Sequence, residues 1–217
     1  MRITSVTSQR NDPDRVNIAI DGEFAFGLSA DLALEAGLHA GLELNDAAVK
    51  RLLAQDETRK ATGAALRLLA HRPRAVVELT RRLRQKGYPP EAIDGAIAKL
   101  REWHYLDDGD FARRWVEARQ THRPRSARLL TQELRQKGVD TDTIGEAIAD
   151  ADLDERADAL RLAQQKAPSY ASLPLDVQQR RLSSFLARRG YGYDIVRVAV
   201  EAALGDDEGG EGGRRGV

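Results

Sequence analysis

The sequence predicts a mainly α-helical protein: tandem three-helix repeats in an elongated curved array, with a small N-terminal antiparallel β meander. Three observations lead to this fold class. Residues 71–97 and 122–148 are two copies of one segment, and helical periodicity runs from about residue 57 to residue 204. The first 28 residues instead alternate apolar and polar side chains, as half-buried strands do.

The repeat is visible at an offset of 51 residues, where HRPRAVVELTRRLRQKGYPPEAIDGAI lies over HRPRSARLLTQELRQKGVDTDTIGEAI without a gap. Fourteen of the 27 aligned positions are identical, which chance does not produce in one register. A third, weaker copy appears when Gly190 is laid over Gly138, with an insertion around residues 167–176. Terminal copies often diverge in this way.

Each copy carries the signals of three short helices. The first helix must end before Pro73, because proline disfavours helical geometry in the preceding residue. The second, at about 75–86, has one apolar stripe and stops at Gly87, and the third begins at Pro90. No copy can cover its own apolar face alone, so neighbouring copies should stack.

The N-terminal meander is predicted from three alternating runs. Asp21-Gly22 is a strong hairpin signal between the second and third runs, and a turn is expected at residues 11–14. After the strands, Ser29 can cap a short helix that ends at Gly37. Asn45 or Asp46 can cap another that reaches about Gln55.

The predicted domains follow from these elements. They are the meander with its short helices (1–56), repeat 1 (57–106), repeat 2 (107–153), the divergent repeat 3 (154–204) and a disordered tail (205–217).

Composition limits the compartment and the class. There are no cysteines, so disulfides and thiolate metal sites are excluded, as suits a reducing compartment. The N-terminus lacks the apolar run of a secretory signal, and no stretch has the roughly 18 apolar residues of a membrane span. We therefore expect a cytoplasmic protein with no membrane partner.

Charge is balanced overall but unevenly placed. The chain has 34 basic and 34 acidic residues, while the first 56 residues hold five basic against nine acidic side chains. Residues 67–86 hold seven basic side chains against one acid, and residues 113–137 hold eight against two. Such asymmetry predicts a basic surface that meets an anionic partner, either nucleic acid or an acidic protein.

Many of these bases recur at equivalent positions of the two copies, although Arg81 and Arg82 become Gln132 and Glu133. Stacked repeats present equivalent positions side by side, so recurring bases should form one surface, which we call the basic ridge. A solvated helix face that happens to be charged is the competing interpretation. The ridge residues are Arg72, Arg74, Arg81, Arg82, Arg84, Lys86, Arg123, Arg125, Arg128, Arg135 and Lys137.

Catalytic and cofactor motifs are missing from the sequence, so we expect a protein that is not an enzyme and carries no cofactor or metal. His71 and His122 occupy one repeated position, which favours a structural or surface role. Asp107-Asp108 is better explained as a helix cap than as a metal pair. Trp103 and Trp115 fit packing in a core or between repeats better than base stacking.

Several short motifs recur along the chain in a fixed order. They are Asp21-Gly22-Glu23-Phe24-Ala25-Phe26, Arg72-Pro73-Arg74, Glu78-Leu79, Leu83, Lys86-Gly87-Tyr88, Tyr105-Leu106-Asp107-Asp108, Phe111-Ala112 and Glu133-Leu134-Arg135-Gln136-Lys137-Gly138-Val139. In this order and spacing the sequence resembles the RecX family of recombinase regulators. The resemblance covers about residues 15–150 well and 155–204 loosely. Two departures concern the start of the second helices, where Ala75 and Ser126-Ala127 stand in place of the usual Ser and Gly-Pro.

The resemblance implies a partner and an action. It implies a non-enzymatic monomer that binds the RecA recombinase filament on DNA and limits filament growth, ATP hydrolysis and strand exchange. Contact with DNA would be weak or made through the filament. Two other interpretations stay open at this point: a duplex-DNA-binding transcriptional regulator of the helix-turn-helix type, and a helical scaffold for an unrelated partner.

Overall fold

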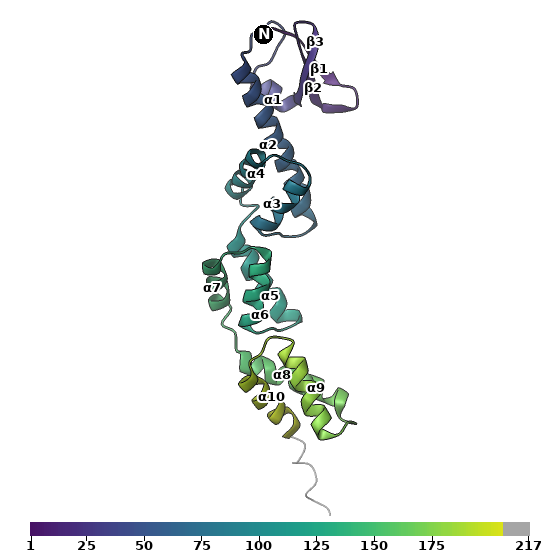
Figure 1. Ribbon diagram of the computed structural model, residues 1–217, viewed down its shortest axis with the longest axis vertical. Helices are drawn as coiled ribbons and strands as arrows, with labels where there is room; N and C mark the ends of the chain where they lie inside the picture. The colour runs from purple at the N-terminus through teal and green to yellow at the C-terminus, as the bar shows by residue number, and fades with distance from the viewer. Residues whose placement is uncertain (206–217) are drawn as a thin grey trace, which may run out of the picture. The chain divides into compact units, whose positions relative to one another are not determined.

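The computed structural model describes residues 1–205, which fall into two compact units that divide after Asp107 (Figure 1). The predicted fold class is confirmed, since a three-stranded antiparallel sheet is followed by repeats of three helices. The predicted disordered tail lies outside the described residues, except for Gly205. The domain boundaries and the curved array stay predictions.

The sheet has the strand order β1-β2-β3, and its inner face forms an apolar core in which Ile3, Ile18 and Leu28 are fully buried. The first turn is tighter than predicted, because β2 begins immediately after Arg10 and Asn11. A shift of register beside Gln9 accommodates the extra residues of β2. The strands are β1 (Ile3–Gln9), β2 (Asp12–Ile20) and β3 (Glu23–Ser29).

Two helices follow the sheet, α1 (Ala30–Glu35) and α2 (Asp46–His71). Asn45 caps α2 as predicted, because its side chain accepts a hydrogen bond from the Ala48 N–H at 2.8 Å. Ser29 occupies the N-cap position of α1 as predicted, but its side chain makes no capping hydrogen bond.

The helix α2 runs for 26 residues, so the predicted end near Gln55 is wrong. No proline or glycine interrupts the chain there, and the helix serves two cores in succession. Leu52 packs against the sheet core. Ala64 and Ala65, further along the same helix, pack in the core of repeat 1.

The remaining helices complete three repeats. Repeat 1 combines the C-terminal half of α2 with α3 (Val76–Gln85) and α4 (Pro90–Glu102). Repeat 2 consists of α5 (Asp108–His122), α6 (Ala127–Lys137) and α7 (Thr141–Asp150). Repeat 3 consists of α8 (Glu155–Lys166), the short 3-10 helix η1 (Ala167–Tyr170), α9 (Leu175–Ala187) and α10 (Tyr193–Gly205).

The second helix of each repeat is built alike. Two leucines of α3, Leu79 and Leu83, are fully buried, as are their counterparts in α6 and α9. A glycine with positive φ follows each helix: Gly87 at 87°, Gly138 at 88° and Gly190 at 90°. Glycine adopts this conformation without the strain that a side chain would add.

In the C-terminal unit, repeats 2 and 3 are joined at the start of α6. The backbone N–H of Ser126 donates to the carbonyl of Arg189 at 3.0 Å, and the N–H of Ala127 donates to the Glu155 carboxylate at 2.7 Å. Gly190 lies so close that a Cβ there would come within 2.4 Å of the Ser126 hydroxyl. The loop between α9 and α10 is therefore fixed against α6.

Asp56 is a buried carboxylate that connects the sheet to α2. Its side chain is 2% exposed and accepts hydrogen bonds from Arg15 at 2.9 Å and from the Ser29 N–H at 2.8 Å. Lys60 adds an ion pair at 3.0 Å. Burial alone would raise the pKa of this carboxyl, but the hydrogen bonds from Arg15, Lys60 and Ser29 hold it below its usual value.

We expect Asp56→Asn to lower the free energy of unfolding of the N-terminal unit by about 3 kcal/mol, because it removes the charge that neutralises Arg15. Urea unfolding followed by circular dichroism measures this loss. The exposed Asp14 provides the control, and Asp14→Asn should change stability by less than about 0.5 kcal/mol. Equal losses in the two variants would contradict a special role for the buried carboxylate.

The effect of Asp56→Asn should also depend on pH. Because the pKa of Asp56 is lower in the folded chain, its stabilising contribution is complete above the unfolded pKa of about 4. That contribution is lost as the pH falls through the folded pKa. The difference in stability between the wild type and Asp56→Asn should therefore shrink as the pH falls below about 4. A constant difference would show that the charge is not what stabilises the site.

Candidate interaction surface

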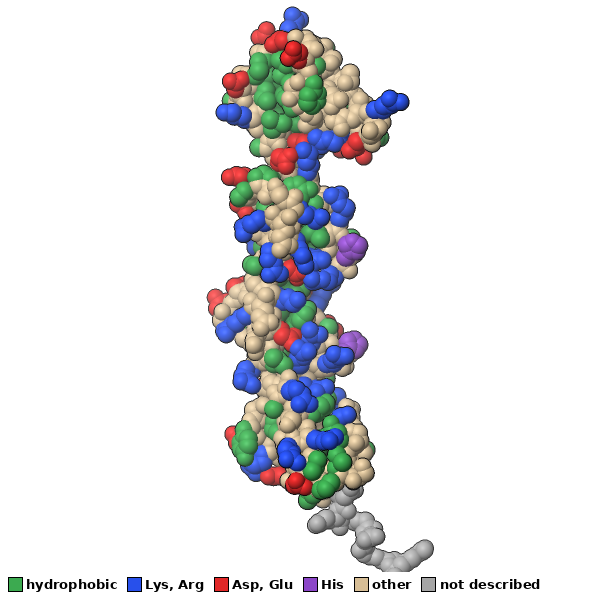
Figure 2. Space-filling view, turned by 45° about the vertical axis from the view of Figure 1, so that its right-hand side comes forward, with side chains coloured by type: hydrophobic (Ala, Val, Ile, Leu, Met, Phe, Trp, Pro, Cys, Tyr) green, Lys and Arg blue, Asp and Glu red, His purple; other side chains and the backbone are tan. Residues whose placement is uncertain are grey.

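The basic ridge contains two kinds of side chain in the structure. Most of its members are exposed, and Figure 2 shows Lys and Arg side chains gathered over the central repeats. Arg74, Arg125 and Lys137 are half-buried and packed into their own repeats. The exposed members are Arg72, Arg81, Arg82, Arg84, Lys86, Arg123, Arg128 and Arg135.

In repeat 1, two ridge arginines neutralise a buried carboxylate. The Glu78 side chain is 5% exposed and pairs with Arg72, at 3.2 Å for one of their hydrogen bonds, and with Arg74. Arg74 is itself only 10% exposed and also donates from Nε to the carbonyl of Leu68 at 3.2 Å. Arg74 therefore fixes the segment that leads into α3 and offers little to a partner.

The charge of Glu78 depends on these arginines. Burial raises the pKa of the Glu78 carboxyl, but the hydrogen bonds and charges of Arg72 and Arg74 outweigh it, and the pKa falls below its usual value. A carboxylate this deeply buried would be costly without a counter-charge.

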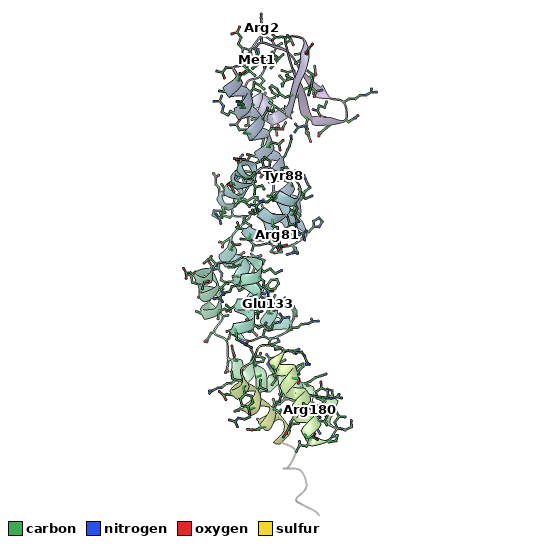
Figure 3. The ribbon with its side chains drawn as sticks, viewed as in Figure 1. Met1, Arg2, Arg81, Tyr88, Glu133 and Arg180 are labelled. Carbon is green, nitrogen blue, oxygen red and sulfur yellow. The ribbon has the colours of Figure 1, made fainter. Side chains whose placement is uncertain are left out.

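Repeat 2 also contains a carboxylate of low exposure that is paired with arginines, but it stands at a different position of the repeat. Glu133 of α6, labelled in Figure 3, pairs with Arg125 and accepts from Arg119 Nε at 2.9 Å. It also accepts from the indole N–H of Trp115 at 2.8 Å. Arg125 is the counterpart of Arg74, whereas Glu133 stands where repeat 1 has Arg82. The repeated arginine thus keeps a structural role although its partner has moved along the helix.

Trp115 is packed in repeat 2, in agreement with its predicted role. Its ring lies 5.9 Å from that of Phe111, and the cations of Arg119 and Lys137 lie 4.3 and 4.8 Å from its centre. Trp103 was predicted to pack as well, and this is wrong. It is 49% exposed, because α4 ends at Glu102 and the chain leaves the apolar stripe there.

The exposed side chains of α6 form a polar stripe that holds no acid. They line a shallow hollow of about 480 Å³, open to solvent. The counterparts on α3 include Thr80, Arg81, Arg84 and Gln85, so most of the stripe recurs in repeat 1. The α6 stripe consists of Arg128, Thr131, Gln132, Arg135 and Gln136.

Three further arginines join the ridge residues of repeat 2, and the sequence analysis did not select them. Arg119 lies on α5, and Arg188 and Arg189 lie in the loop after α9. A signal for one of them was present. When Gly190 is laid over Gly138, Arg189 falls on Lys137, so it occupies the repeated position of Lys86 and Lys137.

The two repeated histidines lie at helix ends, outside the polar stripe of α6. His71 and His122 are exposed at the ends of α2 and α5. Among residues 1–205 no group of three or more histidine, aspartate or glutamate side chains could hold a metal ion. No helix in this part of the chain is long and apolar enough to cross a membrane.

Fold and surface together define a tandem helical-repeat protein that presents basic and polar side chains on the second helix of its repeats. Comparison with known families agrees along most of the described chain. Residues 1–45 match the regulatory protein RecX N-terminal domain. Residues 61–100, 107–148 and 154–200 match the first, second and third three-helix domains of RecX. The chain belongs to the RecX family of regulatory proteins.

Curated relatives support the assignment. A regulatory protein RecX of Clostridium botulinum is 31% identical over 206 residues, which cover 94% of this chain and 96% of the relative. The regulatory protein RecX of Bacillus subtilis is 29% identical over 200 residues, or 92% of this chain and 76% of its own length. That of Thermobifida fusca is 37% identical over 153 residues, or 68% of this chain and 83% of its own.

Solved structures share the fold. A crystal structure of regulatory protein RecX has a TM-score of 0.73 at 22% identity and covers 93% of this chain and 98% of its own. A crystal structure of RecX from Lactobacillus salivarius has a TM-score of 0.60 at 22% identity, with 69% of this chain and 97% of its own covered.

The division of the ridge into packed and exposed arginines can be tested by stability. We expect Arg74→Ala to lower the free energy of unfolding by about 2 kcal/mol, because it leaves buried Glu78 with a single partner. Arg84→Ala removes the same charge from the exposed face of α3 and should change stability by less than about 0.5 kcal/mol. Urea denaturation of both variants measures the difference, and equal values would refute the division.

Proposed function

We propose that this chain is a non-enzymatic regulator that binds the RecA recombinase filament on DNA. Binding limits filament extension and thereby ATP hydrolysis and strand exchange. Membership in a family of regulatory proteins supports the proposal, as does the resemblance of the motifs. The protein acts in the cytoplasm as a monomer, and its contact with DNA alone is weak.

The observation that carries the proposal is the exposed, acid-free stripe that recurs on α3 and α6. Folding does not require these side chains, because they lie outside the leucine stripes that form the cores. A partner that repeats along an axis, such as a filament, can meet equivalent side chains of successive repeats. Several modest contacts on one chain then strengthen each other, because each bound repeat raises the effective concentration of the next.

The ridge is proposed to lie along the filament through its exposed members. The packed members Arg74, Arg125 and Lys137 are held within their own repeats by ion pairs or a ring contact. Variants that remove packed arginines would therefore confuse unfolding with loss of binding. The exposed Arg81, Arg84 and Arg135 are the better choice, because within residues 1–205 their side chains make no hydrogen bond or ion pair.

We expect the triple variant Arg81→Ala/Arg84→Ala/Arg135→Ala to need roughly tenfold more protein than the wild type for the same inhibition, because it loses contacts in two repeats. The measurement is ATP hydrolysis by RecA filaments on single-stranded DNA, with added regulator as the variable. Arg10→Ala/Arg113→Ala/Arg197→Ala removes three exposed bases that do not belong to the ridge and should inhibit like the wild type.

Two results would count against the proposal. If the wild-type chain leaves filament ATP hydrolysis and length unchanged, the proposed function is wrong. If the wild type inhibits and the ridge variant inhibits equally well, the function stands and the ridge is not the contact surface. The family match gives no support to the alternative of a duplex-DNA-reading transcriptional regulator. That alternative would show tight, sequence-dependent binding to naked DNA without recombinase.

A further inference from the structure

The junction between repeats 2 and 3 brings together arginines that are far apart in the sequence. The carbonyl of Arg189 accepts the N–H of Ser126 at 3.0 Å, so the loop after α9 lies against the start of α6. Arg128 reaches the same loop and donates to the carbonyl of Gly190 at 3.5 Å. Arg123 and Arg125 precede α6 by a few residues and therefore lie beside the loop as well.

Positive charge at this junction exceeds the acids that face it. Glu133 pairs with Arg119 and Arg125, and Glu155 accepts the N–H of Ala127. The side chains of exposed Arg123 and Arg188 make no hydrogen bond or ion pair within residues 1–205. Six arginines thus outnumber the carboxylates near them, which are Glu133, Glu155 and Asp158, and Asp158 is paired with Arg161. The six arginines are Arg119, Arg123, Arg125, Arg128, Arg188 and Arg189.

Repeat 3 contributes Arg189, whose guanidinium is fixed in place without forming an ion pair in the described part of the chain. At the position of Glu133 in repeat 2, repeat 3 has Phe185. The guanidinium of Arg189 lies 3.8 Å from the centre of the Phe185 ring, and Nη1 donates to the Phe185 carbonyl at 3.5 Å. A ring fixes a guanidinium in place through a cation–π contact, yet it leaves the full charge for another anion.

The positive charges of the arginines at the junction repel one another. Burial lowers the pKa of the Arg189 guanidinium, and the charges of Arg123 and Arg188 lower it further, although Tyr191 acts in the opposite direction. Burial likewise lowers the pKa of Arg125, with the charges of Arg119, Arg123 and Arg189 adding to the effect. An anion placed among these side chains would relieve their mutual repulsion, which is a property of binding sites rather than of scattered surface charge.

We infer that this arginine cluster is a binding site for the phosphates of a nucleic-acid strand, built jointly by repeats 2 and 3. Guanidinium groups match phosphate oxygens through paired N–H donors. The inference deepens the proposed function and rests on it, because it assigns the DNA of the filament, and not the recombinase, as the partner of this part of the chain.

The surface next to the cluster favours a nucleic-acid strand over an acidic protein. Arg128 belongs both to the cluster and to the α6 stripe, so the strand can continue onto Thr131, Gln132 and Arg135. These side-chain types commonly contact phosphate and sugar. The stripe contains no apolar anchor, whereas the centre of a protein interface usually does.

The first test is binding of a fluorescein-labelled oligothymidylate to the full chain, measured by anisotropy across a salt series without recombinase. We expect Arg123→Ala/Arg188→Ala to weaken binding roughly tenfold and to reduce the slope of log K against log salt by about 1.4, or about 0.7 for each lost phosphate contact. Arg113→Ala/Arg197→Ala removes the same charge elsewhere in the C-terminal unit and should bind like the wild type.

A second pair of variants tests whether both repeats must be held together. Gly190→Ala keeps every charge but forces the α9–α10 loop away from Ser126 and Leu129, so we expect weaker oligonucleotide binding. Gly192→Ala is the matched control, because a Cβ there meets nothing within 4 Å. Circular dichroism at the assay temperature confirms that both variants are folded.

Three outcomes would overturn the site. Unchanged affinity and salt slope in Arg123→Ala/Arg188→Ala would show that these arginines do not bind the strand. An equal loss of affinity in the charge-matched control would show that the attraction is diffuse. Displacement of the oligonucleotide by polyglutamate as readily as by unlabelled oligothymidylate would point to an acidic protein. Because this assay contains no RecA, its failure leaves filament inhibition untouched, and failure of the filament assay leaves this result standing.

Discussion

Buried or half-buried carboxylates neutralised by basic side chains, mainly arginine, are the constraint on which the sheet module and repeats 1 and 2 depend. Asp56 joins the sheet to α2, Glu78 fixes the segment before α3, and Glu133 joins α5 to α6. Each charge is stable in its low-exposure position only because basic side chains supply counter-charges beside it. The basic composition is therefore partly a requirement of folding, and only the remaining cations are free to define a surface for partners.

This division explains why repeats with similar sequences need not present similar surfaces. Repeat 2 has Trp115 where repeat 1 has Ala64, and Glu133 where repeat 1 has Arg82. The Glu133 carboxylate occurs together with the Trp115 indole, because it accepts a hydrogen bond from the indole N–H as well as from the arginines. In repeat 3 the same position is Phe185, and the local charge changes again. One structural position thus decides how much positive charge each repeat retains at its surface.

Local chemistry made much of the fold predictable from the sequence. Gly87, Gly138 and Pro90 mark helix ends through their own backbone preferences, and the leucine spacing of α3 gives its buried face. Predictions failed where a contact with a distant residue determines the local structure. The Ser29 N–H goes to Asp56, 27 residues away, and Arg74 reads as a surface cation until the burial of Glu78 is known. The cluster at Arg189 depends on contacts between repeats, which spacing alone does not reveal.

The continuous helix α2 couples the stability of two modules in the N-terminal unit. Its first half completes the core of the sheet and its second half completes the core of repeat 1. A cut within this helix would strip apolar surface from both cores at once. The two modules should therefore unfold as a single cooperative block, with proteases finding no stable boundary between them. Cellular proteases should therefore either leave this part of the protein intact or degrade it completely.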